Sequence, residues 1–184
     1  VVAGHCLQAS DPGNSARHVT IRAGIPVEAS SMTVNQQCPS SMRATEVISQ
    51  QIMLGKIDVG ASVGMESMTN AAYLLLNARS GLRMGNSSVI DSMLYNGLVD
   101  GFIKEHMGVT AENVAETYNI TRQEQDELAI ISHQRAAAAT KEGKFKDEIV
   151  PIEVKTKKGM VVFERDEHIR GEINKEGLGK LATV

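Results

Sequence analysis

Cys38 is the residue of this sequence whose position most clearly suggests chemistry. An extended segment, residues 31–36, leads into a stretch that favours a helix, and Cys38 stands where the two meet. The first turn of a helix carries backbone N–H groups without intrahelical partners, and the helix dipole adds positive potential there. Both effects favour a thiolate and can stabilise a developing oxyanion. Cys38 is therefore a candidate nucleophile, although most free cysteines are simply small buried side chains.

The other residues with reactive side chains form weaker patterns. Cys6 lies inside an apolar segment and is expected to be structural. The five histidines make no HExxH motif and no Cys/His cluster, so we expect no metal site. His106 stands just before a predicted helix, where capping or packing is the ordinary role. Glu66 could be a buried carboxylate that accepts hydrogen bonds from backbone N–H groups, but its spacing leaves this open.

Composition restricts the class of protein. The 184 residues are 42% apolar and 22% charged, which suits a packed core with an ordinary polar surface. A net charge of -3 gives no general attraction to nucleic acid or membrane, and no apolar run is long enough to span a bilayer. Two cysteines make no disulfide framework, so we expect a reduced, cytoplasmic setting. The first residues resemble the middle of a strand, so targeting cannot be assessed and we expect a piece of a longer chain.

Three short apolar strands and two helices are predicted to position Cys38. The strands are expected at residues 1–7, 31–36 and 57–63, and the helices at residues 14–23 and after residue 38. Asp11 to Gly13 supply a turn, and Asn14 can cap the first helix. The apolar face of the second helix comprises Ala44, Val47, Ile48 and Ile52. This order indicates an α/β layer on a mainly parallel sheet, with strands buried on both faces.

The second part of the chain is predicted to be less regular at first. Residues 64–108 hold many Gly, Asn, Ser and Met residues with little periodicity, and we expect packed loops there. Thr121 and Glu124 form a capping box that opens a helix, and Gly143 ends that helix. The other expected elements are a short helix at residues 110–118 and a β-hairpin of residues 148–154 and 160–164.

Five motifs, in order along the chain, resemble the thiolase family of acetyl-CoA acetyltransferases and 3-ketoacyl-CoA thiolases. They are TVNQQCPSSMRA, GASVGMESMT, DGFIKEHMGVTAENVAE, TRQEQDELAIISHQRAAAA, and FKDEIVPIEVKTKKG with DEHIR. The resemblance covers essentially the whole chain. It implies a thiolase-like α/β fold, with part of the N-terminal βαβαβ core at residues 1–64. Residues 65–184 would then be an inserted loop domain that contributes to coenzyme A binding and oligomer contacts.

The resemblance also implies an activity. Thiolases transfer an acyl group through a cysteine thioester, either condensing two acetyl-CoA molecules or cleaving a 3-ketoacyl-CoA with free coenzyme A. Cys38 would be the acylated nucleophile, with its own backbone N–H donating to the acyl oxyanion. Leu98, His106 and Met107 would line the pantetheine and acyl pocket, and Arg170 would stack on or flank the adenine. Coenzyme A and acyl-CoA would be substrates, and no metal or other cofactor is implied.

Oligomer contacts are part of the same resemblance. Arg79 and Arg83 resemble the cationic loop through which biosynthetic thiolases form tetramers. Residues 31–36 resemble the strand that pairs across the dimer axis. The resemblance therefore implies a homodimer or homotetramer in fatty acid metabolism, without nucleic acid or membrane partners.

Two features depart from the family pattern. Pro39 suits the first turn of a helix, but Pro39 and Ser41 stand where glycine or small residues are usual. The Ser41 side chain could narrow the acyl pocket or crowd the helix packing.

The second departure concerns acid–base groups. The family's catalytic histidine and second cysteine belong to Gly-His-Pro and Cys-x-Gly-Gly-Gly motifs, neither of which occurs here. We therefore expect this chain by itself to be inactive. The alternative is a non-catalytic thiolase-like subunit that binds acyl-CoA or acts as a scaffold. A thiol-dependent hydrolase would need a histidine paired with the cysteine, and the sequence assigns none.

Overall fold

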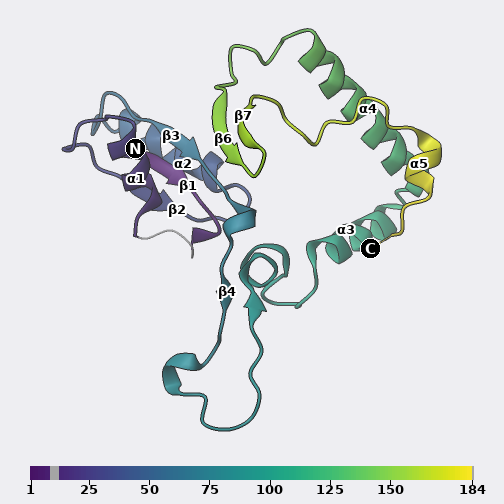
Figure 1. The fold of residues 1–184 in the computed structure, drawn as a ribbon, viewed down its shortest axis with the longest axis horizontal. Coiled ribbons are helices and arrows are strands. Elements are labelled where there is room, and N and C mark those ends of the chain that lie inside the picture. Colours follow the sequence, from purple (N-terminus) through teal and green to yellow (C-terminus); the bar gives the residue numbers. More distant parts are fainter. Residues whose placement is uncertain (9–12, 184) are drawn as a thin grey trace. The chain divides into compact units, whose positions relative to one another are not determined.

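The computed structural model describes residues 1–8 and 13–183, and the chain divides into two compact units, Val1–Met107 and Gly108–Val184 (Figure 1). Asp11 and Pro12, predicted in a turn, lie outside the described residues. No helix in the described part of the chain is long and apolar enough to cross a membrane. The predicted division into an N-terminal core, residues 1–64, and a loop domain that binds coenzyme A, residues 65–184, is a different division and stays a prediction.

The first unit contains a three-stranded parallel sheet. Its strands, β1 (Val2–Gly4), β2 (Met32–Val34) and β3 (Ser62–Gly64), lie in the order β2-β1-β3. Helix α1 (Ser15–Arg22) connects β1 to β2, and α2 (Ser40–Met53) connects β2 to β3. Because the chain reverses direction between these crossovers, right-handed connections place the two helices on opposite faces of the sheet. The predicted βαβαβ order and the parallel sheet are confirmed.

The strands are shorter and less covered than predicted. All three residues of β1 are buried, whereas β2 and β3 contain only exposed and half-buried residues. Residues 57–61, predicted as part of the third strand, lie outside any strand. β2 and β3 are the edges of the sheet and have one neighbouring strand each, so more of their surface stays open. The prediction that all strands are buried on both faces is therefore wrong for these two.

The core of the first unit lies between α2 and the sheet. Its buried cluster comprises Val2, Ala44 and Ile48, with Val34, Val47 and Ile57 packed against it. Ile52 belongs to the same predicted apolar face but is 43% exposed. The 14 residues of α2 extend about 21 Å, whereas a three-residue strand covers about 10 Å. The sheet therefore ends before the last turn of α2, and Ile52 remains open.

Capping of α1 follows the prediction. The side chain of Asn14 accepts a hydrogen bond from the Arg17 N–H at 3.2 Å. This satisfies one of the backbone donors that a helix start leaves unpaired.

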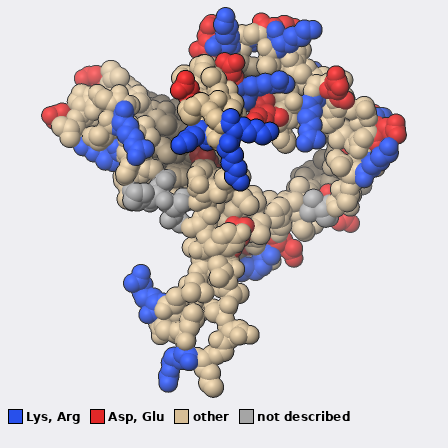
Figure 2. Space-filling model, in the orientation of Figure 1, with Lys and Arg blue, Asp and Glu red and all other residues tan. Residues whose placement is uncertain are grey.

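The remainder of the first unit is irregular, as predicted, but it contains short elements that the sequence did not indicate. They are β4 (Tyr73–Leu74), which pairs antiparallel with β5 (Ile90–Asp91), two 3₁₀ turns at Met68–Asn70 and Ala78–Ser80, and a π-helical segment, η4 (Met93–Leu98). Figure 2 shows Lys and Arg side chains and no Asp or Glu on the excursion between β4 and β5. These cations are Arg79 and Arg83, and their role in tetramer contacts stays a prediction.

The second unit contains the helices and the hairpin expected there. Its elements are most of α3 (Met107–Tyr118), α4 (Arg122–Lys141), β6 (Ile152–Thr156), β7 (Gly159–Phe163) and α5 (Lys175–Gly179). The hairpin is confirmed, but β6 begins later than predicted and only Lys157 and Lys158 form the turn. The helix α3 begins earlier than predicted, and α5 was not predicted.

The capping box of α4 is confirmed. The Thr121 side chain accepts from the Glu124 N–H at 3.2 Å, and the Glu124 carboxylate accepts from the Thr121 N–H at 2.8 Å. Gly143 follows the helix with a φ of 72°, a left-handed conformation that glycine adopts without strain. The sequence therefore defines both ends of α4.

Candidate active site

Cys38 lies in a turn immediately before α2, and it is exposed. The helix begins at Ser40, with Pro39 as its N-cap, so the prediction that Pro39 belongs to the first helical turn is wrong by one position. Cys38 nevertheless stands at the amino end of the helix, beside backbone N–H groups that have no intrahelical partner.

Ser40 and Gln37 fix the conformation of this turn. The Ser40 hydroxyl donates to the Gln37 carbonyl at 2.5 Å and accepts from the Gln36 N–H at 2.9 Å. Gln37 has a φ of 57°, a left-handed conformation that is uncommon for a residue other than glycine. The Asn35 side chain accepts from the Gln37 N–H at 2.9 Å. Contacts on both sides therefore hold the backbone that presents Cys38.

Two glycines allow the strands to approach the start of α2. A Cβ atom on Gly4 would lie 2.3 Å from the Ser41 backbone nitrogen, closer than non-bonded atoms can come. A Cβ atom on Gly64 would lie 2.8 Å from the Ser41 Cβ atom. Glycine is therefore required at the ends of β1 and β3. The Ser41 side chain, unusual for the resembled motif, fits because residue 64 has no side chain.

A cavity of about 350 Å³ adjoins the candidate nucleophile. Its lining residues are Gly4, His5, Gln37, Cys38, Ser40, Ser41, Gly64, Met65 and Glu66. All belong to the carboxyl ends of β1 and β3 or to the amino end of α2. This is the edge of a parallel sheet where α/β proteins place their ligand sites.

Glu66 binds backbone donors at this edge. Its carboxylate accepts from the Cys6 N–H at 3.0 Å and from the Leu7 N–H at 2.9 Å. The same carboxylate lies 3.4 Å from Nε2 of the buried His5, whose Nδ1 lies 2.9 Å from the Ser15 hydroxyl. The hypothesis that Glu66 accepts from backbone N–H groups is confirmed, but the expectation that it is buried is wrong, because its side chain is 32% exposed at the open edge of the sheet. Glu66 thereby joins the segments that follow β1 and β3.

Cys6 has a different environment from Cys38. It lies just beyond β1 rather than inside a strand, and its thiol donates to Oε1 of Gln37 at 3.0 Å. Burial, followed by the negative charges of Glu66 and Cys38, raises the pKa of the Cys6 thiol. A thiol that resists ionisation is a poor nucleophile. The hydrogen bond from Cys6 to Gln37 instead gives Cys6 a structural role in the turn.

Three of the predicted substrate residues come together elsewhere in the first unit. Val99 and His106 form an antiparallel bridge, so Leu98 and Met107 occupy the next facing positions of the two segments. Leu98 is half-buried, and Met107 is partly exposed at the start of α3. Their proximity suits a shared binding surface, and their role in binding stays a prediction.

Asp100 closes the turn between these segments. Its carboxylate accepts from the Phe102 N–H at 2.7 Å and from the Ile103 N–H at 2.9 Å. The hydrogen bonds from Ile103 and Phe102 hold the pKa of Asp100 below its ordinary value. Asp100 therefore remains an anion that stabilises the turn carrying His106.

Arg170 belongs to the second unit. It lines a cavity of about 520 Å³ together with Gly177, Leu178 and Leu181. Its backbone N–H donates to Nδ1 of His133, on α4, at 3.2 Å. The predicted contact between Arg170 and adenine stays a prediction.

Metal ligation has no support in residues 1–8 and 13–183. No group of three or more His, Cys, Asp or Glu side chains there is arranged to hold a metal ion.

Sequence reasoning missed His5, Gln37 and Ser40 as parts of the site. The sequence position of His5 could have indicated its role, because a polar residue directly after the first buried strand lies at the sheet edge where ligand sites form. Nothing in the sequence indicated the role of Gln37, since its left-handed conformation depends on the contacts of Ser40 and Asn35 around it. The small size of Ser40 suggested only an uncrowded approach to Cys38, and its hydrogen bonds across the turn were not foreseen.

Comparison with known proteins decides the family. Residues 1–184 match the family model described as "Thiolase, N-terminal domain". The chain belongs to the thiolase family. It is 44% identical over 182 residues to the acetyl-CoA acetyltransferase of Chromobacterium violaceum and 45% identical over 186 residues to that of Syntrophomonas wolfei. The matches cover 98% and 100% of this chain but 46% and 47% of those proteins, so the chain spans about half their length.

Solved structures agree with this assignment. The acetyl-CoA acetyltransferase of Syntrophomonas wolfei matches with a TM-score of 0.88 and 46% identity, covering 98% of this chain and 45% of that one. The acetyl-CoA acetyltransferase of Bacillus anthracis matches with a TM-score of 0.93 and 39% identity, covering 100% of this chain and 47% of that one. The predicted family and thiolase-like α/β fold are confirmed.

Proposed function

We propose that this protein is an acyl-CoA acyltransferase of the thiolase type, in which Cys38 carries the acyl group. The observation that carries the proposal is the placement of Cys38, exposed at the amino end of α2. Ser40 and Gln37 hold its turn, and a cavity adjoins it. The names of the relatives supply the reaction class.

The first half-reaction forms a thioester on Cys38. Its thiolate attacks the acyl carbonyl of acyl-CoA, and the carbonyl electron pair moves onto oxygen. The backbone N–H of Cys38 donates to this oxyanion, and the amino end of α2 adds positive potential. In acetoacetyl-CoA synthesis the donor is acetyl-CoA: the oxyanion collapses, the carbon–sulfur bond to coenzyme A breaks, and coenzyme A leaves as a thiolate. In thiolysis Cys38 attacks the C3 carbonyl of a 3-ketoacyl-CoA, the bond between C2 and C3 breaks, and acetyl-CoA leaves as an enolate that then takes up a proton.

The second half-reaction releases the acyl group. In thiolysis, the thiolate of free coenzyme A attacks the Cys38 thioester and forms acyl-CoA. In acetoacetyl-CoA synthesis, the carbanion of a second acetyl-CoA attacks instead. In both directions Cys38 departs as a thiolate.

Proton transfer needs groups beyond those assigned here. By resemblance, a histidine and a second cysteine from motifs absent in this chain activate Cys38 and protonate the leaving thiolate. The residues 1–184 alone are therefore expected to be inactive.

Substrate recognition completes the proposal. Leu98, His106 and Met107 contact the pantetheine and acyl portions, and Arg170 stacks against the adenine. The scheme uses no metal and no other cofactor. A homodimer or homotetramer, a cytoplasmic location and a role in fatty acid metabolism stay predictions.

Turnover by the full-length protein tests the proposal. Acetoacetyl-CoA and coenzyme A should yield acetyl-CoA, and Cys38→Ser should lower kcat by at least about a thousandfold. The matched control is Cys6→Ser, which should retain most of the activity. Comparable turnover in Cys38→Ser would refute the assignment. Tight binding of acetyl-CoA by the unmodified protein without turnover would favour a non-catalytic, acyl-CoA-binding subunit.

A further inference from the structure

Helix α4 is attached to both ends of the segment that forms the Arg170 cavity. This wall segment, residues 170–181, contains one short helix, α5, and lines a cavity of about 520 Å³. The hydrogen bonds inside this segment are local, in α5 and the turns beside it, so contacts with α4 are needed to fix where the segment lies. Two polar side chains of α4, Arg122 and His133, provide the attachments.

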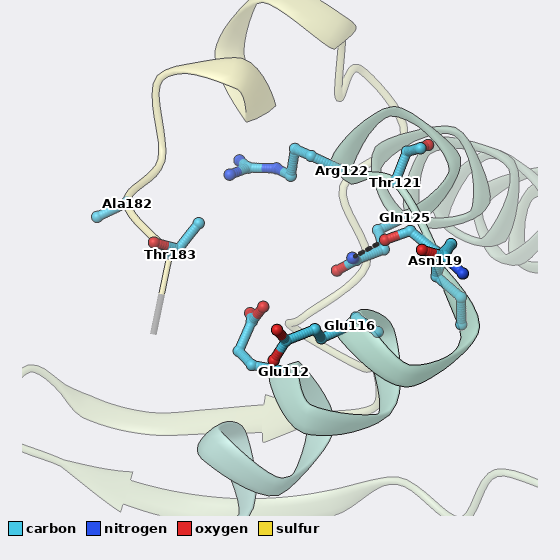
Figure 3. Close-up of a pocket in the computed structure, with 10 residues that line it drawn as sticks. Glu112, Glu116, Asn119, Thr121, Arg122, Gln125, Ala182 and Thr183 are labelled. Atoms are coloured by element: carbon cyan, nitrogen blue, oxygen red, sulfur yellow. Dashed lines mark hydrogen bonds between the residues drawn. The ribbon is translucent and has the colours of Figure 1, made fainter.

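Arg122 holds the far end of the wall segment. Its Nη2 donates to the Leu178 carbonyl at 2.6 Å and to the Leu181 carbonyl at 3.2 Å. Its Nε donates to Oδ1 of Asp126, one turn along α4, at 2.9 Å, which orients the guanidinium group. Figure 3 shows Arg122 extending from α4 towards the segment that contains Ala182 and Thr183. Leu178 and Leu181 also line the cavity, so Arg122 acts directly on its wall.

His133 holds the near end of the same segment. Its Nδ1 accepts from the Arg170 N–H at 3.2 Å, and its ring lies 5.9 Å from the ring of His168. The next residue, Gly171, packs so closely against α4 that a Cβ atom there would lie 3.0 Å from the Ala137 Cβ atom. His133 therefore fixes the backbone position of Arg170, independently of the guanidinium group.

The two attachments lie at well-separated positions on α4. Arg122 and His133 are eleven residues apart on one helix, which separates them by about 16 Å along its axis. A capping box closes the amino end of α4, so this helix is a firm support. Lys175 and Glu127 form an ion pair at 3.1 Å between the two attachments, but both side chains are about half exposed and water weakens such a pair.

We propose that Arg122 and His133 are positioning residues for the nucleotide half of a coenzyme A substrate, because they hold the two ends of the cavity wall that contains Arg170, Leu178 and Leu181. This rests on the proposed function. Neither side chain needs to touch the substrate. Arg122 sets the position of the leucine side chains through their backbone carbonyls, and His133 sets that of Arg170 through its backbone N–H.

A comparison of acetyl-CoA with S-acetylpantetheine distinguishes loss of nucleotide positioning from general damage to the protein. In the full-length protein, Arg122→Gln should raise KM for acetyl-CoA about tenfold and leave kcat nearly unchanged, because binding energy away from the reacting carbonyl is lost. With S-acetylpantetheine, which lacks the nucleotide, the same variant should match the unmodified protein. Arg135→Gln is the matched control, since Arg135 is an exposed arginine of the same helix.

The acceptor atom of His133 allows a rescue experiment. His133→Leu removes the acceptor for the Arg170 N–H and should raise KM for acetyl-CoA. His133→Asn places an amide oxygen near the position of Nδ1 and should restore most of the affinity. Thermal unfolding of each variant checks that the fold is intact.

The outcomes separate this inference from the proposed function. If the unmodified protein acetylates Cys38 and Arg122→Gln leaves KM for acetyl-CoA unchanged, the inference is wrong and the proposed function stands. Equal losses with acetyl-CoA and S-acetylpantetheine would also overturn it, because they indicate general damage. If the unmodified protein does not acetylate Cys38, the proposed function itself fails.

Discussion

The hydroxyl of Ser40 donates to the carbonyl of Gln37 across the turn that carries Cys38, at 2.5 Å. Ser40 is 4% exposed, and the same hydroxyl accepts from the Gln36 N–H. The bonds that hold this turn therefore involve neither the backbone nor the thiol of Cys38. It follows that Cys38 can be acylated or replaced without loss of the turn, which makes substitutions at this residue informative.

Replacement of Ser40 by alanine tests this support. Ser40→Ala removes the acceptor of the Gln36 N–H and one donor to the Gln37 carbonyl, and we expect a loss of about 0.5–1.5 kcal/mol in the free energy of unfolding. The rate of Cys38 acetylation should also fall. Chemical denaturation and acetylation kinetics provide the two readouts. Ser49→Ala, at an exposed serine of the same helix, is the control and should change neither.

Addition of one methyl group at Gly4 tests the approach of β1 to α2. Gly4→Ala would bring a Cβ atom within 2.3 Å of the Ser41 nitrogen, so the start of the helix must move. We expect a destabilisation of about 1–3 kcal/mol or more, measured by thermal unfolding.

The control for this change is Gly101→Ala. A Cβ atom on Gly101 would meet no atom within 4 Å, so its stability should stay near that of the unmodified protein. Equal stability of both alanine variants would show that the close approach at Gly4 is not real.

Local patterns in the sequence were sufficient for much of the fold. Asn14 and the pair of Thr121 and Glu124 marked helix starts correctly, because capping depends on residues that are neighbours along the chain. The exposure of Ile52 could not be foreseen, since it depends on where the strands end beneath α2. Likewise, α5 depends on its attachment to α4 by Arg122, a contact between residues far apart in sequence.

The candidate site was predictable in part. Cys38 was identified from the change from extended chain to helix and from the motif around it. The contacts of Glu66 with the N–H groups of Cys6 and Leu7 join segments about sixty residues apart, which spacing alone cannot indicate. The hydrogen bond from the Arg170 N–H to His133 likewise joins residues far apart in sequence, so it depends on the packing of the second unit.

Ser41 provides a test of substrate size. Its side chain lines the cavity beside Cys38, so Ser41→Gly enlarges that space. We expect the ratio of kcat/KM for a longer 3-ketoacyl-CoA to that for acetoacetyl-CoA to rise about tenfold. Ser41→Ala keeps the Cβ atom and removes only the hydroxyl, so it should change the ratio less. An unchanged ratio in both variants would mean that Ser41 does not limit the acyl group.

Glu124 should give the stability of α4 a dependence on acid. Hydrogen bonds from the backbone and side chain of Thr121 hold the pKa of Glu124 below its ordinary value of 4.5. The unfolded chain therefore binds this proton more readily, and the stabilisation is complete above pH 4.5 and is lost as the pH falls through the lower folded value.

Comparison with Glu124→Gln isolates this effect. The unmodified protein should be more stable than the variant at pH 7, and the difference should shrink as the pH falls below 4.5. Urea denaturation followed by circular dichroism measures it. A difference for Glu124→Gln that stays constant with pH would contradict the role of its charge.

The central claim is that Cys38 carries the acyl group, and the most direct measurement is to map that group. The full-length protein is incubated with acetyl-CoA, quenched with acid, digested and sequenced by mass spectrometry. We expect an acetyl group on the peptide that contains Cys38 and none on Cys6, with release of the label when free coenzyme A is added. An acetyl group on another residue, or labelling that persists in Cys38→Ser, would contradict the claim.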